Sequence, residues 1–345
     1  MRAAVTRSRS VMEVADVREP DVAGAGELLV RPETVGLCGS DFHYFHGDIG
    51  LTDDPDDLYP RVQGHEFSAI VESVGADCPP GFVTGQRVAV WPVTACGDCA
   101  CCRMGRENAC ENISLIGIHT DGALQQRLRV PAHQAFPVAL DDPRLAAFVE
   151  PMSIAVRTVV RGQIVAGEHV LVLGAGPIGQ AVAIAAADRG ATVMLADRVP
   201  ARLELNASGA DLAMATDSDA DLLALVRQWA GRGLPEVVVE ATGSKQAMRA
   251  SLDLVAAAGR ILVVGLSSHE VPLRIGALPF RELDVLGVST CQSVDFAAAA
   301  DLVLRHRAAV SPLITHEFSL EEAPHAIAYA IANPGEVLKA VVHLP

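Results

Sequence analysis

The chain has 345 residues, of which half are hydrophobic and one fifth charged, and its formal net charge is −15. This length favours two domains over one, and the apolar content is too high for a disordered chain. The acidic balance argues against a general binder of nucleic acid or anionic membranes, because few cations are available to meet phosphates. The first residues carry arginines without a following apolar run, so we expect no signal peptide and a cytoplasmic protein.

Short β-like runs separated by glycine and proline dominate the first part of the chain. Examples are 27–37, 66–75 and 86–93, and no long amphipathic helix precedes residue 143. This pattern predicts a β-rich domain. Within it, the acidic, turn-rich stretch 48–60 is expected to be a solvated surface segment.

A set of metal-ligand side chains is spread over the same part of the chain. Cys38 stands in "GLCGSDFH", His65 and Glu66 in "QGHEF", and Glu150 in "FVEPM". Each of these residues taken singly is more often structural than functional. A thiolate, an imidazole and a carboxylate together, with a fourth position left open, are what a catalytic zinc ion requires.

Five of the eight cysteines fall between residues 96 and 110. Four of them follow the spacing C-x2-C-x2-C-x7-C, namely Cys96, Cys99, Cys102 and Cys110. Four thiolates suit a structural, tetrahedral zinc ion. An iron–sulfur cluster is a weaker alternative because the last spacing does not fit the bacterial ferredoxin pattern, and thiols without metal are a third. Cys101, Cys78 and Cys291 are interpreted as bystanders.

A glycine fingerprint follows an apolar run at residues 169–173. Gly174, Gly176 and Gly179 fit G-x-G-x-x-G, and Asp197 ends the next expected strand. Between a strand and an alanine-rich helix, this pattern predicts dinucleotide binding, with the pyrophosphate at the helix N-terminus. The uncharged stretch 170–187 is long enough to span a membrane, but its glycines and proline indicate strand, turn and helix instead.

Two more strand-like runs end near Thr242 and near Gly265 and Leu266. Loops at such strand ends face the cofactor crevice of a parallel sheet, although they could also be plain connections. From about residue 151 strands and helices alternate, which predicts a doubly wound parallel sheet. After about residue 294 the chain reads as helices and a final strand.

The order of these motifs resembles the zinc-dependent medium-chain alcohol dehydrogenases, in particular their polyol, sugar-acid and threonine dehydrogenase branch. The resemblance spans essentially the whole chain. It implies an α/β protein with a β-rich GroES-like catalytic zinc domain, formed by 1–150 with 294–345, and a Rossmann domain at 151–293. It also implies that Cys38 and His65 bind catalytic zinc with Glu66 or Glu150 as acidic ligand, and that the protein is a homo-oligomer, for which we expect a tetramer.

The family also implies a proton relay from the substrate alcohol through Ser40 and the cofactor ribose to His43; the alternative is that Ser40 caps a helix and His43 is a surface residue. Asp41 is expected to orient these groups. The expected cofactors are NAD and two zinc ions per chain, one catalytic and one structural. Asp197 favours NAD over NADP because a 2′-phosphate would meet its carboxylate, and Arg198 is the counter-argument. The full set of expected cofactor-binding residues is Gly174, Gly176, Pro177, Ile178, Gly179, Asp197, Arg198, Arg202, Thr242, Gly265 and Leu266.

The combined prediction is an enzyme that transfers a hydride from a secondary alcohol, such as a polyol, sugar acid or cyclitol, to NAD. Tyr44 is expected to line the substrate pocket. The loop 287–293 has small residues where the polyol and threonine enzymes tend to place arginine, which leaves the individual substrate open. The alternatives are an enzyme similar to L-threonine 3-dehydrogenase and a non-catalytic, zinc-stabilised protein that senses NAD.

Overall fold

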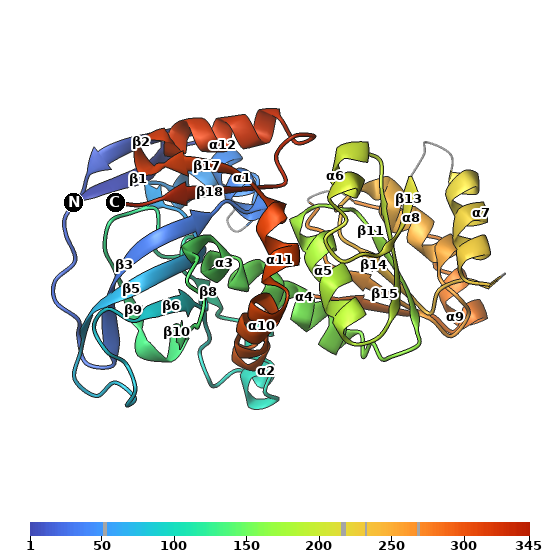
Figure 1. The fold of residues 1–345 in the computed structure, drawn as a ribbon, viewed down its shortest axis with the longest axis horizontal. Helices are drawn as coiled ribbons and strands as arrows, with labels where there is room; N and C mark the ends of the chain where they lie inside the picture. Colours follow the sequence, from blue (N-terminus) through green and yellow to red (C-terminus); the bar gives the residue numbers. More distant parts are fainter. Residues whose placement is uncertain (51–53, 215–218, 232, 268–269) are drawn as a thin grey trace. The chain divides into compact units, whose positions relative to one another are not determined.

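The computed structural model describes residues 1–50, 54–214, 219–231, 233–267 and 270–345. These residues form two compact units. Unit 1 comprises Met1–Ser153 and Gln292–Pro345, and unit 2 comprises Ile154–Cys291. Both chain ends therefore belong to unit 1 (Figure 1). Residues 51–53 of the acidic stretch 48–60 lie outside the described ranges.

Strand pairing in unit 1 is mostly antiparallel. Its largest sheet has the order β10-β6-β5-β3-β18-β17 with β9 on β3, a second sheet has the order β2-β1-β4, and β7 pairs with β8. The strands are β1 (Arg2–Ser8), β2 (Val11–Asp16), β3 (Glu27–Gly36), β4 (Arg61–Val62), β5 (Glu66–Val74), β6 (Arg87–Val90), β7 (Val93–Thr94), β8 (Ser114–Leu115), β9 (Leu128–Pro131), β10 (Ala135–Pro137), β17 (Ile314–Ser319) and β18 (Lys339–His343). Strand β18 thus comes from the end of the chain and pairs antiparallel with β3.

Helices of unit 1 are short before residue 143, as the sequence predicts. The α-helices are α1 (Gly39–His46), α2 (Ala100–Arg103), α3 (Pro143–Ala147), α10 (Ser293–Arg305), α11 (Arg307–Val310) and α12 (Ala323–Ala332), while α4 (Val149–Arg161) begins in unit 1 and ends in unit 2. The 3-10 helices are η1 (Pro55–Leu58), η2 (Glu107–Ala109), η3 (Ala132–Gln134), η4 (Ser311–Leu313) and η5 (Leu320–Glu322).

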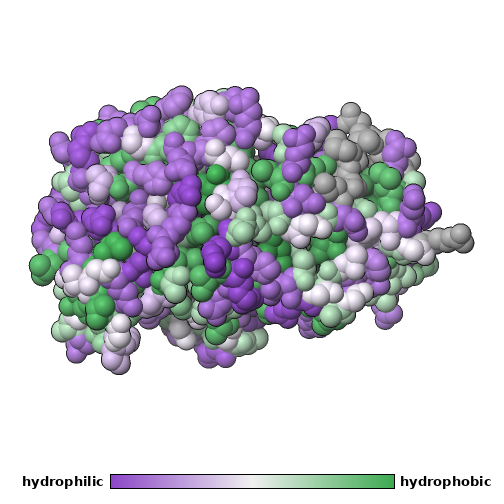
Figure 2. All heavy atoms as spheres, viewed as in Figure 1, coloured by the Kyte–Doolittle hydropathy of each residue, from purple (hydrophilic) through white to green (hydrophobic). Residues whose placement is uncertain are grey.

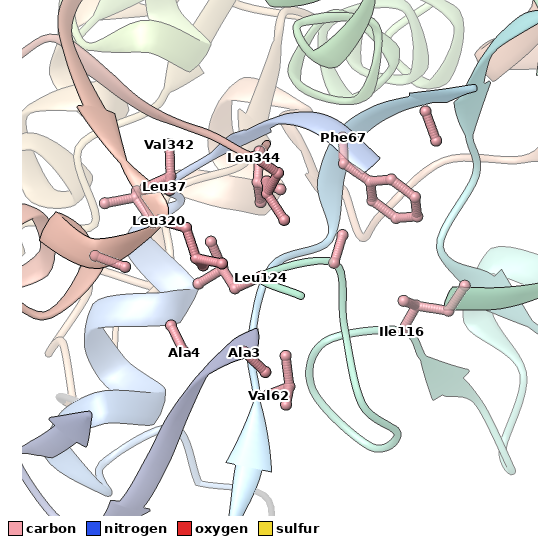
Figure 3. Packing of buried hydrophobic residues seen from close by; sticks show 14 of the residues in the cluster. Ala3, Ala4, Leu37, Val62, Phe67, Ile116, Leu124, Leu320, Val342 and Leu344 are labelled. Atoms are coloured by element: carbon pink, nitrogen blue, oxygen red, sulfur yellow. The ribbon is translucent and has the colours of Figure 1, made fainter. Parts of the chain in front are cut away.

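Both chain segments of unit 1 contribute to one hydrophobic core. Leu37, Phe67 and Leu124 of the first segment lie with Leu320 and Val342 of the second (Figure 3). All five side chains are buried. Removing this apolar surface from water stabilises the unit, so its two segments depend on each other for a complete core.

Unit 2 holds a six-stranded, all-parallel sheet with the order β13-β12-β11-β14-β15-β16. This is the 3-2-1-4-5-6 order of the doubly wound dinucleotide-binding fold, so the predicted fold class is confirmed. The strands are β11 (His169–Leu173), β12 (Thr192–Asp197), β13 (Asp211–Met214), β14 (Val237–Glu240), β15 (Arg260–Val263) and β16 (Asp284–Gly287). The helices are α5 (Pro177–Asp188), α6 (Pro200–Leu205), α7 (Asp219–Trp229), α8 (Lys245–Leu254) and α9 (Ala277–Arg281).

Strand order in unit 2 reverses between β11 and β14, and such a switch point is where ligands bind at the carboxyl ends of the strands. The uncharged stretch 170–187 forms β11, a turn and α5, as predicted. Within the described ranges, no helix has both the length and the apolar character needed to cross a bilayer. Hydrophilic side chains are spread over the face drawn in Figure 2.

Candidate functional site

The first group of predicted ligands lies in unit 1, where β3 turns into helix α1. Cys38 is the N-cap of α1, with extended backbone angles. Its backbone N–H donates to Asp41 Oδ2 at 2.9 Å, which closes a capping box. The cap fixes the backbone at Cys38, and Asp41 itself is completely buried.

His65 and Glu66 reach the same place from the start of β5. One ligand atom of each of Cys38, His65 and Glu66 lies within 4.8 Å of the others. Glu66 pairs with Gly36 across the β3–β5 ladder. A Cβ at residue 36 would stand 2.3 Å from Glu66 Oε2, so a glycine there makes room for the carboxylate. The three predicted ligands therefore converge.

A chain of buried polar side chains supports His65. Its Nδ1 lies 3.6 Å from Asp41 Oδ1. Gln63 donates through Nε2 to the Asp41 carbonyl at 2.9 Å, and Thr6 Oγ1 donates to Gln63 Oε1 at 2.6 Å. Burial lowers the pKa of His65, but the Asp41 carboxylate and the Cys38 sulfur outweigh burial and hold this pKa well above its ordinary value. An imidazole oriented by a carboxylate is a common arrangement around metal-binding histidines.

Lys339 is a member of this site that the sequence analysis missed. It is the first residue of β18 and is 4% exposed, and its Nζ donates to Glu66 Oε1 at 2.9 Å, to Glu66 Oε2 at 2.7 Å and to the Leu37 carbonyl at 3.0 Å. Burial lowers the pKa of Lys339, whereas the negative charges of Glu66 and Cys38 raise it, and the result lies above the ordinary value. An almost fully buried lysine is rare unless it is paired, but the sequence around Lys339 gives no sign of its partner.

Glu150, in the first turn of α4, is buried beside the same charges. Burial raises the pKa of its carboxyl to about 7, while the positive charge of His65 works in the opposite direction. Glu150 does not belong to the group of ligand atoms within 4.8 Å, unlike Glu66. Of the two acidic candidates, Glu66 is thus the one that stands with Cys38 and His65 in this conformation.

The predicted relay residues lie on α1. Ser40 Oγ is 3.3 Å from His65 Nε2, and His43 Nδ1 is 3.0 Å from Asp48 Oδ1. Among the residues that the structure describes, no hydrogen bond joins Ser40 to His43. The prediction for Tyr44 is wrong, because this side chain has no exposed surface and its hydroxyl donates to the Leu58 carbonyl inside unit 1.

The four cysteines of the C-x2-C-x2-C-x7-C motif also converge in unit 1. Their Sγ atoms lie within 4.8 Å of one another, and the closest pairs, such as Cys99–Cys102 and Cys96–Cys110, are 3.4 Å apart. Sulfurs bound at about 2.3 Å from one tetrahedral zinc ion would lie about 3.8 Å apart, so the spacing fits such an ion. All eight cysteines are free, and Cys101 is outside the group.

Backbone N–H groups in this loop stabilise anionic sulfur. The N–H groups of Cys102 and Glu111 lower the pKa of Cys99 to about 6. Desolvation and the neighbouring Cys99 raise the pKa of Cys102 to about 12. Adjacent thiolates repel one another, and a divalent cation removes that repulsion.

In unit 2, the glycine fingerprint connects β11 to α5. Gly176 is the N-cap of α5, and Pro177 occupies its first turn, followed by Ile178. A Cβ at residue 179 would lie 1.7 Å from the Gly174 carbonyl oxygen, so helix and strand meet too closely for any side chain there. A Cβ at residue 176 would meet nothing within 4 Å, which leaves space over the helix N-terminus, a favourable place for phosphate.

Asp197 ends β12 and turns its carboxylate toward this loop. It accepts the N–H of Ala175 at 2.6 Å and that of Val199 at 2.8 Å. Arg202 Nη1 lies 3.7 Å from Asp197 Oδ2, and the exposed Arg198 donates to Gln246 at 3.3 Å. A carboxylate has about four acceptor positions, so Asp197 retains capacity for ribose hydroxyls.

The remaining predicted cofactor residues follow β14 and β15. Thr242 donates both its N–H and its hydroxyl to Glu240 Oε1, and Leu266 is 68% exposed. In the predicted substrate loop, Thr290 has a positive φ of 42° and Cys291 is 1% exposed. Glu240 is a second residue that the sequence analysis missed.

The chain matches two family models. Residues 24–140 match the alcohol dehydrogenase GroES-like domain, and residues 177–305 match the zinc-binding dehydrogenase model. The chain is 35% identical to the L-galactonate-5-dehydrogenase of Escherichia coli K12 over 94% of both chains.

Solved structures give the same result. A zinc-binding dehydrogenase structure from Sinorhizobium meliloti 1021, bound to NADP, is 33% identical, with a TM-score of 0.88 and 99% and 98% of the two chains covered. An alcohol dehydrogenase structure from E. coli CFT073, complexed with NADH, is 27% identical, with a TM-score of 0.86 and 99% of each chain covered. The similarity thus extends over both units.

Proposed function

Because the chain belongs to the zinc-dependent medium-chain alcohol dehydrogenase family, we propose that it oxidises a secondary alcohol of the polyol or sugar-acid class with NAD. The observation that carries this proposal is the convergence of Cys38, His65 and Glu66 within 4.8 Å in unit 1. Sulfur, nitrogen and oxygen donors of three side chains, with the fourth coordination position open, are the donor set of catalytic zinc.

The residues of unit 1 fit two zinc ions with different tasks. Cys96, Cys99, Cys102 and Cys110 supply four sulfurs, which close a coordination sphere and leave no room for substrate. Cys38 and His65, with Glu66 or Glu150, leave one position free. At that position zinc would polarise the substrate oxygen as a Lewis acid, and NAD would accept the hydride from the substrate carbon.

In the proposed reaction, side chains of the protein transfer the proton of the substrate hydroxyl. Ser40 Oγ, 3.3 Å from His65 Nε2, would accept the hydrogen bond of the substrate hydroxyl. The half-exposed His43 would deliver the proton to water, and its contact with Asp48 at 3.0 Å holds the imidazole for that task. Proton transfer through positioned side chains contributes typically about 10²–10⁴-fold to a rate.

Unit 2 would bind the dinucleotide, and residues 151–293 would form the cofactor domain, with 1–150 and 294–345 forming the catalytic domain. The open space at Gly176 and the start of α5 suit the pyrophosphate. Asp197 would accept the adenosine ribose hydroxyls and disfavour a 2′-phosphate, which supports NAD over NADP. Arg202, beside Asp197, would flank the adenosine.

The proposed substrate class follows from the relatives. A sugar acid such as L-galactonate, the substrate in the name of one relative, is our first candidate. A threonine dehydrogenase activity is the alternative. Sugar acids and threonine both carry a carboxylate, so the small residues Ser289 and Thr290, in place of an arginine, do not separate the two, and the preference rests on the relatives.

We also infer a cytoplasmic homo-oligomer, and a tetramer is the state we expect. Strand β16 is an edge of the sheet in unit 2, and Val285 on it is 39% exposed. Phe280, in the preceding helix α9, is 92% exposed. Unpaired strand edges and exposed aromatic side chains commonly mark contacts between subunits.

The test is an assay at 340 nm with NAD⁺, zinc-loaded protein and a panel of sugar acids, polyols, cyclitols and threonine. We expect reduction of NAD⁺ with at least one sugar acid or polyol and its loss in Cys38→Ser. Turnover of threonine alone would favour the alternative enzyme. Failure of every secondary alcohol, by protein that binds both zinc and NAD⁺, would contradict the dehydrogenase proposal and favour a sensing protein.

A further inference from the structure

Glu240, the last residue of β14, is a buried carboxylate that the proposed function does not yet use. It is 1% exposed. Its Oε1 accepts the N–H of Thr242 at 2.8 Å, the Thr242 hydroxyl, and the N–H of Gly243 at 3.1 Å. Among the described residues, no lysine or arginine forms an ion pair with it. A buried acceptor surrounded by donors on one short turn fixes the shape of that turn.

The same residue ties this turn to the end of the next strand. The Glu240 carbonyl accepts the N–H of Val264 at 2.9 Å and that of Gly265 at 3.0 Å. A Cβ at residue 265 would stand 2.1 Å from Gly243 N and 2.8 Å from Glu240 Oε2. The turn after β14 and the loop after β15 are therefore packed backbone against backbone around one carboxylate.

This interlocked pair of loops lies at the switch point of the sheet. β14 is the neighbour of β11, on the side opposite β12. A Cβ at residue 174, in the glycine fingerprint, would lie 2.7 Å from Thr242 Cγ2, so the turn touches the fingerprint loop. Each half of such a sheet binds one mononucleotide of the cofactor. Asp197, the expected partner of the adenosine ribose, ends β12, so the adenosine half binds on the β12 side. The nicotinamide half would then bind beside the loops after β14 and β15, which Glu240 joins.

We propose that Glu240 is a positioning residue for the nicotinamide half of the dinucleotide, which it serves by fixing the backbone of residues 242–243 and 264–265. The proposal rests on NAD binding by unit 2, as proposed above. Glu240 touches no reacting atom in this role. Its substitution should weaken the binding of a whole dinucleotide and spare a ligand that occupies only the adenosine half.

The experiment compares Glu240→Gln with wild type by calorimetric titration with NAD⁺ and, separately, with AMP, at matched pH and salt. Glutamine keeps the volume and one acceptor oxygen, but its NH₂ group replaces Oε2, which lies 3.3 Å from the N–H donor of Gly243. We expect the Kd for NAD⁺ to rise about tenfold, equivalent to about 1.4 kcal/mol, while the Kd for AMP changes less than twofold. Glu236→Gln is the control, because the exposed Glu236 directly precedes the same strand and accepts the N–H of His169 at 2.8 Å, away from the turn after β14.

Two outcomes would contradict the role of Glu240 without affecting the proposed function. One is a wild-type Kd for NAD⁺ in Glu240→Gln, and the other is an equal loss of NAD⁺ and AMP affinity, which would make Glu240 a support of the fold only. A wild-type protein that binds neither nucleotide would defeat the proposed function and this inference together. Should Glu240→Gln not fold, Glu240→Asp gives the same comparison, because it keeps the charge and withdraws it from the turn by one methylene group.

Discussion

Lys339 Nζ donates hydrogen bonds to both carboxylate oxygens of Glu66, at 2.9 and 2.7 Å, and the two side chains are 4% and 1% exposed. The pair joins the start of β18 to the start of β5 beside Cys38 and His65. The lysine holds Glu66 by charge and at the same time competes with any cation for its oxygens. Lys339 therefore affects both the stability of unit 1 and the choice of the acidic ligand.

Replacing Lys339 with methionine should destabilise unit 1 strongly. The substitution leaves Glu66 buried without its cation, and breaking a buried pair in this way costs about 3–5 kcal/mol. In a unit of this size that loss corresponds to a fall in Tm of roughly 6–20 °C, measured by circular dichroism. The double variant Lys339→Met, Glu66→Gln should recover much of the loss. Equal Tm values for the single and the double variant would show that the charge of Glu66 is not the cause.

Substitutions in the four-cysteine loop should separate the two zinc ions. Cys99→Ser removes one of four convergent sulfurs, and we expect metal analysis to fall from about two zinc ions per chain to about one. Cys101→Ser is the control, because Cys101 is the neighbouring cysteine outside the group and should keep both ions. Loss of zinc in Cys101→Ser, or none in Cys99→Ser, would contradict the assignment of ligands.

Thr6→Val tests the polar chain behind His65. Valine has nearly the same shape but cannot donate to Gln63 Oε1, which lies 2.6 Å from Thr6 Oγ1 in the interior. An unsatisfied buried acceptor costs about 1–3 kcal/mol, so Tm should fall. Zinc should also be lost faster to a chelator, because Gln63 holds Asp41 and Asp41 lies against His65.

The matched control for that variant is Thr34→Val. Thr34 is equally buried and its hydroxyl lies 3.0 Å from His343 Nδ1, in a network that includes neither Gln63 nor Asp41. We expect a similar fall in Tm and an unchanged rate of zinc loss. A faster loss in both variants would mean that metal retention only follows overall stability.

A surface network around Arg144 should make stability depend on acid pH. The hydrogen bond from Arg144 lowers the pKa of Asp142, and contacts with His343 and Arg144 lower the pKa of Glu317. The pKa values of Asp142 and Glu317 are thus lower in the folded protein than in the unfolded chain. Their contribution to stability is complete above the unfolded pKa values, about 4, and is lost as the pH falls below them.

Arg144→Met should therefore destabilise the protein at pH 7 and have little effect near pH 2–3. The pairs are partly exposed, so we expect at most about 1 kcal/mol at neutral pH. Thermal unfolding of both proteins at pH 7, 5, 4 and 3 measures the difference. A difference in Tm that stayed constant down to pH 3 would show that Arg144 acts through packing and not through its charge.

The sequence predicted those parts of the sites whose residues stand close together in recognisable order. The strand-to-helix glycine pattern predicted the β11–α5 turn, and the spacing from Cys96 to Cys110 predicted that four sulfurs would meet. In both cases local geometry determines the arrangement, because few conformations connect residues so near in the chain.

Residues that act through pairing across a sheet could not be predicted. Lys339 is 273 residues from Glu66, and only the register of β18 on β3 brings it to the site. Glu240 reads in sequence as the polar end of a buried strand. Its role depends on which loop lies beside it, and strand order determines that. Tyr44 was misassigned because its neighbours in sequence serve the site while its own side chain turns inward.

The discontinuity of unit 1 has a consequence for how the protein is made. Strands β17 and β18, with Lys339, are synthesised only after all of unit 2 has left the ribosome's peptidyl transferase centre. Until then β3 lacks its partner on one side, and the carboxylate of Glu66 has no lysine. Unit 2 is contiguous and can fold during translation, whereas the metal-binding unit must wait for the nascent chain to return, with an open sheet edge in the meantime.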